Sequence, residues 1–237
     1  MKVLITGQAG FIGYSLAKSL TKDGHEVVGF DNFNPYEDTP LKDSRVKDLK
    51  RNYDVETLSL DLNDRKGLDK LFKEYEPELV VHLAARAGVR ASIEHPRAYH
   101  TDNIDGTQTL IEACEAADIQ KILYASTSSL MAGNDISPWN EQEPSKHMLN
   151  PYSYSKFVNE CQFKISKIPT TIGLRFFTVY GPWGRPDMAL FAFTDKIANG
   201  EPIQVFNGGK MSRDFTYIDD IIGGIMILID ADITGND

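Results

Sequence analysis

The chain has 237 residues, of which 41% are hydrophobic, and its 34 acidic and 25 basic residues give a formal net charge of −9. This length allows one substantial hydrophobic core with at most a small second lobe. The negative charge disfavours non-specific binding to nucleic acid or to an anionic membrane. No apolar run approaches the roughly 20 residues of a membrane span, and the N-terminus lacks a signal-peptide pattern. We therefore expect a cytoplasmic protein.

Short β-branched runs alternate along the chain with longer runs of helical period, which is the pattern of a parallel sheet with crossover helices. The sequence predicts strands at about residues 2–6, 26–30, 55–60, 78–83, 121–126 and 170–176. It predicts helices at about residues 11–22, 64–74, 97–117, 152–167 and 218–230. Residues 32–52 are polar and charged, so we expect an insertion there, between the second and third strands. The expected fold class is therefore α/β.

The character of the sequence changes after Arg175, where Pro182 and Pro186 are followed by a helical stretch and a Gly-rich segment. We expect a main domain at residues 1–176 and a smaller, partial lobe at residues 177–237, with some segments returning to the main domain. The last predicted helix ends close to the end of the chain, so we expect this lobe to be truncated.

The two cysteines, Cys114 and Cys161, form no CxxC motif and have no nearby His pair. We therefore expect neither a disulfide framework nor a metal site. Both thiols are predicted to be inert helix residues.

A glycine-rich turn lies directly between the first predicted strand and the first predicted helix. Gly7, Gly10 and Gly13 lack side chains, which permits a tight turn and a close approach of a pyrophosphate to the backbone. The N-terminus of the helix then faces the phosphates. Asp31 follows the second strand, where its carboxylate can accept hydrogen bonds from both adenosine ribose hydroxyls and would repel a 2′-phosphate. These features predict a Rossmann-type site for NAD rather than NADP, although an ordinary Gly-rich turn with a loop Asp has the same residues.

Tyr152 and Lys156 lie four residues apart at the start of a predicted helix, so they share one face. A phenol, whose ordinary pKa is about 10, acts as a base at neutral pH only if a cation stabilises its phenolate, and Lys156 can be that cation. The fifth strand ends in the hydroxyl run 126–129, at the sheet edge where ligands bind in this architecture. Thr127 is the candidate for the hydroxyl between a substrate oxygen and Tyr152. An amphipathic helix start and strand-end capping are the structural alternatives, and His82 is expected to be a packed core residue.

With these motifs in place, the sequence resembles the extended short-chain dehydrogenases/reductases, the NAD-dependent epimerase/dehydratase family, and among them the UDP-glucuronate 4-epimerases. The resemblance rests on the glycine turn, on residues 30–34 (FDNFN) and 82–90 (HLAARAGVR), on the Tyr-x-x-x-Lys pair and on the long run 174–188 (LRFFTVYGPWGRPDM). The chain departs from the family at residues 130–133 (LMAG), where Val-Tyr-Gly is usual, and at Arg86, where Gln is usual.

The resemblance implies a doubly wound parallel sheet and a catalytic triad of Thr127, Tyr152 and Lys156. The predicted cofactor-binding residues, from the motifs and the resemblance together, are Gly7, Gly10, Phe11, Ile12, Gly13, Asp31, Asn32, Asn34, Asp61, Leu62, Ala84, Ala85, Asn103, Tyr152, Lys156 and Phe177. Among these, Asp61 is expected either to contact the adenine of the cofactor or to be an ordinary loop aspartate.

The resemblance also implies a UDP-sugar site, with uronates preferred. Arg185 is implied to pair with the sugar carboxylate through its planar donors, unless backbone carbonyls hold it instead. Arg213 is implied to meet the nucleotide diphosphate, whereas Arg90 stands either at the substrate or in a solvated loop. The predicted substrate-binding residues are Arg90, Ser128, Ser129, Thr178, Arg185 and Arg213.

The implied reaction is inversion of C4 of UDP-glucuronate to UDP-galacturonate through a 4-keto intermediate, with NAD retained between turnovers. Relatives that dehydrate the sugar or release CO2 carry an acidic residue beside the triad hydroxyl, whereas Ser128 and Ser129 follow here. The alternatives are a UDP-glucuronate decarboxylase, a UDP-glucose 4-epimerase, and a truncated chain that binds NAD but is catalytically silent. The resemblance further suggests a homodimer through the helices near 97–117 and 152–167, unless their apolar faces belong to the core.

Overall fold

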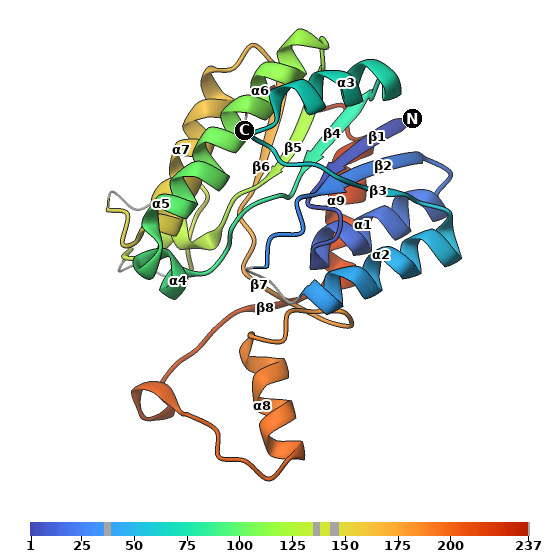
Figure 1. Cartoon of the computed structure of the whole chain (residues 1–237). Helices are drawn as coiled ribbons and strands as arrows, with labels where there is room; N and C mark the ends of the chain where they lie inside the picture. Colours follow the sequence, from blue (N-terminus) through green and yellow to red (C-terminus); the bar gives the residue numbers. More distant parts are fainter. Residues whose placement is uncertain (36–38, 135–137, 143–146, 237) are drawn as a thin grey trace.

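In the computed structural model, which describes residues 1–35, 39–134, 138–142 and 147–236, the main strands form one seven-stranded parallel sheet (Figure 1). Its spatial order is β3-β2-β1-β4-β5-β6-β9. The strands are β1 (Lys2–Thr6), β2 (Glu26–Asp31), β3 (Thr57–Ser59), β4 (Leu79–His82), β5 (Lys121–Ala125), β6 (Thr170–Leu174) and β9 (Gly235–Asn236). The order reverses between β1 and β4, which is the point at which doubly wound sheets bind ligands. The predicted α/β fold is confirmed.

The helices cover both faces of the sheet. On one face lie α1 (Phe11–Lys22), α2 (Thr39–Tyr53) and α9 (Ile218–Asp230); on the other lie α3 (Arg65–Tyr75), α6 (Gly106–Ala116) and α7 (Pro151–Ile165). Short helices α4 (Val89–Glu94) and α5 (Pro96–Tyr99) precede α6. Both cysteines are helical, as predicted, with Cys114 buried in α6 and Cys161 exposed on α7.

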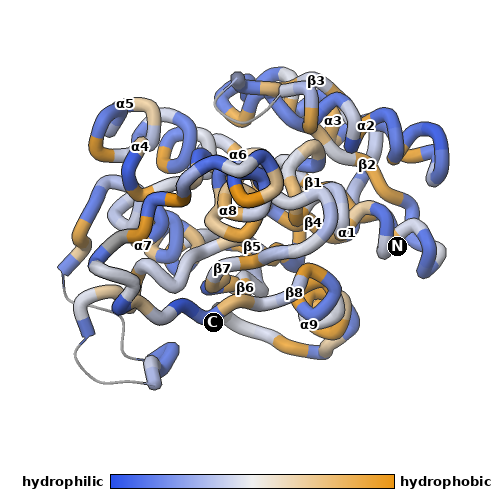
Figure 2. Tube along the Cα trace, turned by 90° about the horizontal axis from the view of Figure 1, so that it is seen from below, coloured by the Kyte–Doolittle hydropathy of each residue, from blue (hydrophilic) through white to orange (hydrophobic). Residues whose placement is uncertain are grey.

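The two cores follow from the two-residue period of the central strands. In β1, Val3 and Ile5 face the core under α1 and α9, whereas Leu4 faces the core under α3 and α6. Because both faces are covered, the middle of the strand is apolar at three consecutive positions, Val3 to Ile5, rather than alternating. Figure 2 shows the same separation, with apolar segments in the interior strands and along α9 and hydrophilic segments on the outer helices.

The strands end together at the edge where the candidate ligand site lies. Thr6 is level with Phe30 in β2 and with His82 in β4. The segments that follow these strands therefore emerge side by side, although they are far apart in the sequence.

Four of the predicted elements differ in detail from the structure. The polar insertion at 32–52 contains helix α2, apart from residues 36–38, which lie outside the described residues. Its buried residues are Lys42, Arg45 and Leu49, so it lacks the apolar stripe on which the sequence prediction depended. The predicted helix at 97–117 is interrupted by a π-helical turn at His100–Asp105. The strands predicted at 55–60 and 170–176 are shorter, at Thr57–Ser59 and Thr170–Leu174.

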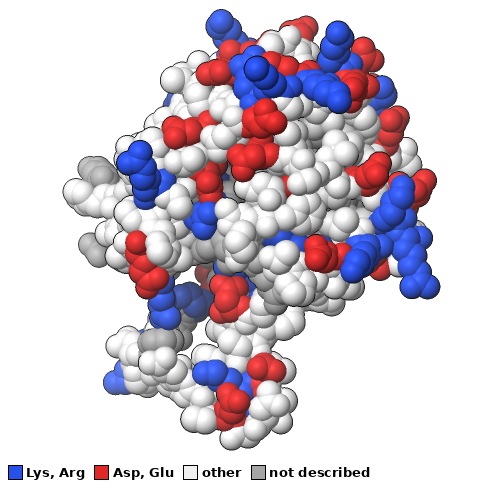
Figure 3. Space-filling model, viewed as in Figure 1, with Lys and Arg blue, Asp and Glu red and all other residues white. Residues whose placement is uncertain are grey.

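A small lobe follows β6 and projects from the carboxyl edge of the sheet (Figure 1). Its strands β7 (Thr178–Tyr180) and β8 (Phe215–Tyr217) pair in parallel, and α8 (Ala189–Ala198) has no buried residue. On the face drawn in Figure 3, a hollow separates this lobe from the main body, where acidic and basic side chains are interspersed. None of the described helices is long and apolar enough to cross a bilayer.

Helix α1 packs closely on the turn that precedes it because Gly13 has no side chain. A Cβ at this position would overlap the Gly7 carbonyl oxygen and lie 2.9 Å from the Gln8 Cα. Both of these atoms belong to the backbone, so neither can move out of the way without shifting the turn. Gly13 thus sets the position of α1 against the carboxyl end of β1.

We predict that Gly13→Ala destabilises the protein by about 1–3 kcal/mol, because the added methyl group forces the turn and α1 apart. Gly224→Ala in α9 is the matched control, since a Cβ there meets no atom within 4 Å. The control is expected to stabilise the protein by about 0.5–1 kcal/mol through helix propensity. Urea unfolding of both variants measures the difference. Equal stability of the two variants would contradict the packing role of Gly13.

Candidate active site

One cavity of about 520 Å³ lies at the carboxyl edge of the sheet. It is lined by the β1–α1 turn, by the segments that follow β2, β4, β5 and β6, and by the start of α7. The structure brings together in it most of the predicted site residues: Gly7, Gly10, Phe11, Ile12, Gly13, Asp31, Asn32, Asn34, Asp61, Leu62, Ala84, Ala85, Thr127, Ser128, Ser129, Tyr152, Lys156, Phe177, Thr178 and Arg185. Three other predicted residues, Asn103, Arg90 and Arg213, are not among those that line it.

The glycine turn forms one wall of the cavity. The Gly7 and Gln8 amides donate to the Phe30 carbonyl at 2.8 and 3.1 Å, which holds the turn against the end of β2. A Cβ at Gly7 would lie 2.7 Å from the Ala84 nitrogen, so the segment after β4 packs directly on the turn. The N-terminal residues of α1 line the cavity without a charged side chain among them. This bare wall of backbone and helix N-terminus fits the diphosphate of a dinucleotide.

Two acids occupy the β2 and β3 end of the cavity. Asp31 is buried, and its Oδ1 accepts from the Phe33 amide at 2.8 Å and from Lys42 Nζ at 2.9 Å. Lys42, on α2, was absent from the sequence prediction because the segment was expected to be an insertion. Its ammonium neutralises Asp31, so the charge of Asp31 alone is an incomplete argument for excluding a 2′-phosphate.

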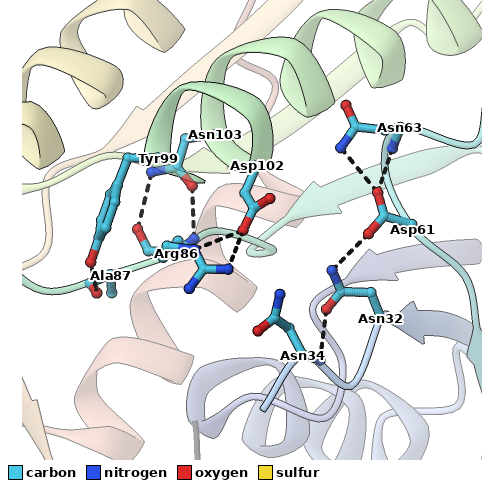
Figure 4. A network of polar contacts seen from close by, with 9 residues as sticks. All are labelled: Asn32, Asn34, Asp61, Asn63, Arg86, Ala87, Tyr99, Asp102 and Asn103. Carbon is cyan, nitrogen blue, oxygen red and sulfur yellow. Dashed lines mark hydrogen bonds and ion pairs between the residues drawn. The ribbon is translucent and has the colours of Figure 1, made fainter. Parts of the chain in front are cut away.

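Asp61 is held by its neighbours across the same end of the cavity. It accepts from Asn32 Nδ2 at 2.8 Å and from the Asn63 amide at 2.8 Å (Figure 4). Burial favours the neutral carboxyl, but these hydrogen bonds outweigh it and hold the pKa of Asp61 below its usual value. An ionised, fixed carboxylate therefore stands where the adenosine of a dinucleotide is expected.

Helix α7 presents the predicted Tyr and Lys from its first two turns. Asn150 caps the helix by accepting from the Ser153 amide at 2.9 Å, and Ser153 completes a capping box. Lys156 is buried, and its Nζ donates to the Ala125 carbonyl at 3.0 Å, at the end of β5. Tyr152 and Lys156 both line the cavity, as does buried Thr127 beside them at the end of β5.

Burial lowers the pKa of Lys156 to about 8, against the opposing effect of Glu160. The group is thus still mostly a cation at neutral pH, and its charge lies in a site of low polarity where its field is strong. Such a cation can stabilise a phenolate on Tyr152, which is the chemistry that the spacing predicted.

A partly buried carboxylate beside the site, Glu160, was not predicted from the sequence. Glu160 accepts from Ser126 Oγ at 2.6 Å and from Arg175 Nε at 2.9 Å. These bonds connect α7 to the ends of β5 and β6, and so fix the helix that carries Tyr152 and Lys156. The signal was the spacing of four residues between Lys156 and Glu160, but it equally fits an exposed helix pair.

Asn103 lies beneath the cavity rather than on its wall. It is buried, and its Nδ2 donates to Ser155 Oγ at 2.9 Å and to the Arg86 carbonyl at 3.0 Å. Its Oδ1 accepts from the Arg86 amide at 2.7 Å. In this structure Asn103 therefore joins the π-helical turn to α7 and to the segment after β4, and its role toward a cofactor stays a prediction.

His82 is buried at the end of β4, as expected for a core residue. Its Nδ1 lies 2.7 Å from Thr6 Oγ1, and its Nε2 lies 3.0 Å from Thr107 Oγ1. Thr6 Oγ1 also accepts from the Ala84 amide at 3.0 Å. This chain of hydrogen bonds therefore positions Ala84, which lines the cavity. Burial, with a smaller effect from Lys156, lowers the pKa of His82 to about 3, so the ring is neutral and all three contacts are satisfied.

Arg185 reaches the cavity from the lobe, and a carboxylate already holds it. Its Nε and Nη2 donate to the two oxygens of Asp187 at 3.0 and 2.6 Å. One partner of Arg185 is thus the carboxylate of Asp187, and its contact with a sugar carboxylate stays a prediction. The other predicted arginines are exposed: Arg90 on α4, and Arg213 with Nη1 donating to the Ser212 carbonyl at 2.8 Å.

The loop that carries Arg185 is tied to the glycine turn by Arg45, a fully buried residue of α2. Its Nη1 donates to the Ala9 carbonyl at 2.9 Å and its Nη2 to the Trp183 carbonyl at 2.7 Å. The sequence offered no signal for this contact, because the two carbonyls come from segments that lie far apart along the chain.

Leu130 and Met131, where the family usually has other residues, pack into the interior next to the site. Both side chains are buried in a 3-10 turn at Ser128–Met131, while Ser128 and Ser129 line the cavity. Among the described residues, no three His, Cys, Asp or Glu side chains form a group that would hold a metal ion.

Comparison with known proteins agrees with this geometry. The model of the NAD dependent epimerase/dehydratase family matches residues 3–237. Protein CapI of Staphylococcus aureus is 47% identical over 97% of this chain and 69% of its own length, and a probable UDP-glucuronate 4-epimerase of Rhizobium meliloti (strain 1021) is 45% identical over 96% and 68%. The crystal structure of UDP-glucuronic acid 4-epimerase from Bacillus cereus, in complex with UDP-glucuronic acid and NAD, superposes with a TM-score of 0.89 at 36% identity, covering 98% of this chain and 74% of that one.

Proposed function

The chain belongs to the NAD dependent epimerase/dehydratase family, and we propose that it inverts C4 of UDP-glucuronate to give UDP-galacturonate. One observation carries the proposal: a single cavity is lined by the glycine turn, by Thr127, Tyr152 and Lys156, and by Arg185. These groups supply, in order, a cofactor cradle, a base, and a cation for a sugar carboxylate. The enzyme would thus be an isomerase that acts on a nucleotide sugar.

The cofactor of this proposal is NAD. Gly7, Gly10 and the N-terminus of α1 would hold its diphosphate, and Asp31 and Asp61 its adenosine. Bound NAD would supply the acceptor, and afterwards the donor, of one hydride. Because the hydride that leaves C4 returns to C4, the same cofactor serves every turnover, and the protein has no need to release it.

Tyr152 provides the proton chemistry. As a phenolate stabilised by Lys156, it removes the proton of the sugar 4-hydroxyl while the C4–H bond breaks, and the sugar becomes a 4-ketone. After the sugar turns over in the site, C4 receives the hydride on its opposite face, and Tyr152 returns the proton to the oxygen. Thr127, which follows β5 and lines the cavity, would hold the reacting oxygen by a hydrogen bond.

Arg185 and Thr178 give the proposal its preference for a uronate. A 4-keto uronate is a β-keto acid and loses CO2 readily, so an epimerase must hold the carboxylate in an orientation that disfavours cleavage. The planar guanidinium of Arg185 can hold it at two points. Ser128 and Ser129, which line the cavity beside Thr127, offer no carboxylate for a further proton transfer.

The chain spans 68–69% of the length of the first relatives compared above. The activity of those whole proteins therefore comes to this chain as a proposal, and the competing functions are outcomes of its test. The cytoplasmic location expected from the sequence likewise stays a prediction.

Incubation of the purified protein with UDP-glucuronate, followed by separation of the products, tests the function. We predict formation of UDP-galacturonate, and we predict that Tyr152→Phe lowers the turnover by at least about 100-fold while leaving NAD bound, because the general base is lost. Tyr154→Phe, two residues along the same helix and exposed, is the matched control and is expected to keep its activity. UDP-xylose as the product would show a decarboxylase instead, and no turnover with NAD bound would show a silent chain.

We predict that Arg185→Ala raises the KM for UDP-glucuronate by about 10–100-fold, because a charge-assisted, two-point contact is lost. Any turnover of UDP-glucose should change by less than threefold, because that sugar has no carboxylate. Steady-state kinetics with UDP-glucuronate and UDP-glucose measure the difference between the two effects. An equal loss with both sugars would refute the proposed contact.

We also propose that two copies of the chain pair through α7. Tyr154, Phe157 and Ile165 are exposed on this helix at helical spacing, with exposed fractions of 52%, 39% and 82%. Covering such a stripe is favourable by roughly 25 cal/mol per Å² of apolar surface. Light scattering should give the mass of a dimer, and Phe157→Glu should lower it to that of one chain; a wild-type mass of one chain would contradict the pairing.

A further inference from the structure

Arg86 reaches into the proposed cofactor cavity from the end of β4, and its guanidinium has no assigned role there. We propose that Arg86 binds the diphosphate of the dinucleotide from the β4 side of the cavity, and so slows its release. The inference rests on the proposed function in one respect, namely that NAD occupies this cavity.

The position of Arg86 follows from the packing of the segment after β4. The Leu83 amide donates to the Thr6 carbonyl at 3.2 Å, and the Ala84 amide donates to Thr6 Oγ1 at 3.0 Å. A Cβ at Gly7 would touch Ala84, so this segment lies against the glycine turn. Arg86 emerges two residues later and lines the same cavity as the turn.

The backbone and the side chain of Arg86 are held separately. Asn103 bonds both the amide and the carbonyl of Arg86, at 2.7 and 3.0 Å, and thereby fixes its backbone. Asp102 accepts from Arg86 Nε at 2.7 Å, and the same Asp102 oxygen lies 2.7 Å from Nη2. In Figure 4 the guanidinium extends from Asp102 toward Asn34, on the β2 side of the cavity. Asp102 thus orients a planar, largely buried cation over the cavity.

The charges of the cavity favour Arg86 for the diphosphate. The glycine turn contains no basic residue, and the partial positive charge of a helix N-terminus is only about half an elementary charge. Among the described residues, the cations that line the cavity are Lys42, Arg86, Lys156 and Arg185.

The other three cations lie in other parts of the cavity wall. Lys42 is paired with buried Asp31 beyond β2. Lys156 donates to the carbonyl at the end of β5. Arg185 belongs to the loop after β7 and is paired with Asp187. Arg86 is the cation on the segment that packs against the glycine turn, and its five N–H donors suit phosphate oxygens.

The test measures binding of NAD, ADP and adenosine by calorimetry to protein stripped of cofactor. Arg86→Gln removes the charge but leaves the backbone bonds to Asn103 in place. We expect its Kd for NAD and for ADP to rise about tenfold or more, and its Kd for adenosine to stay within twofold of the wild type. Arg97→Gln is the matched control, because Arg97 is exposed on α5 and does not line the cavity. It should bind all three ligands as the wild type does.

An Arg86→Gln protein that binds NAD within twofold of the wild type would overturn the inference. A loss of equal size with adenosine would also overturn it, since the contact would then be with the nucleoside or would act through the fold. Failure of the proposed function has a different signature, namely wild-type protein that binds NAD but converts no UDP-sugar.

Discussion

The architecture depends on the close approach of three backbone segments at the carboxyl end of β1. Gly7 lies against the Ala84 amide, and Gly13 lies against the Gly7 carbonyl, with no room for a Cβ at either position. This contact brings α1, the end of β4 and the turn between β1 and α1 into one corner of the sheet. Since main-chain N–H groups and a helix N-terminus line that corner, it suits an anion before any side chain contributes.

Buried cations are the second feature of the site, and burial of a charge is costly unless partners compensate for it. Here each buried cation donates hydrogen bonds to a partner on a segment that lines or supports the cavity. Lys42 bonds Asp31, Arg45 bonds two carbonyls from distant segments, and Lys156 bonds the end of β5. In consequence α2, which has little apolar surface, is bonded to the site through Lys42 and Arg45. Function and stability therefore share the same residues in this part of the molecule.

The two ends of the cavity differ in the burial and hydrogen bonding of the residues that form them. The cofactor end rests on strands that are covered on both faces, and its side chains are fixed by networks around Asn103 and Glu160. The other end depends on a loop after β7, with Arg185 held by exposed Asp187 and with no buried residue in α8. Under the proposed function, the more buried end would hold the retained cofactor, and the more exposed end would hold the sugar while its ketone turns over between two hydride transfers.

The sequence by itself determined the α/β fold, the glycine turn, and the presence of Tyr152 and Lys156 on one face of a helix, because each depends on local spacing or on a two-residue or four-residue period. It also located Thr127 and Asp31, which end strands at a common edge. Only the tertiary structure decided that Lys42 neutralises Asp31, that Arg45 joins the turn to the loop that carries Trp183 and Arg185, and that Arg86 lines the cavity. These contacts connect charged residues across long stretches of chain. A polar side chain carries no periodic signal that tells a buried partner from a solvated one, so its role is settled by the packing around it.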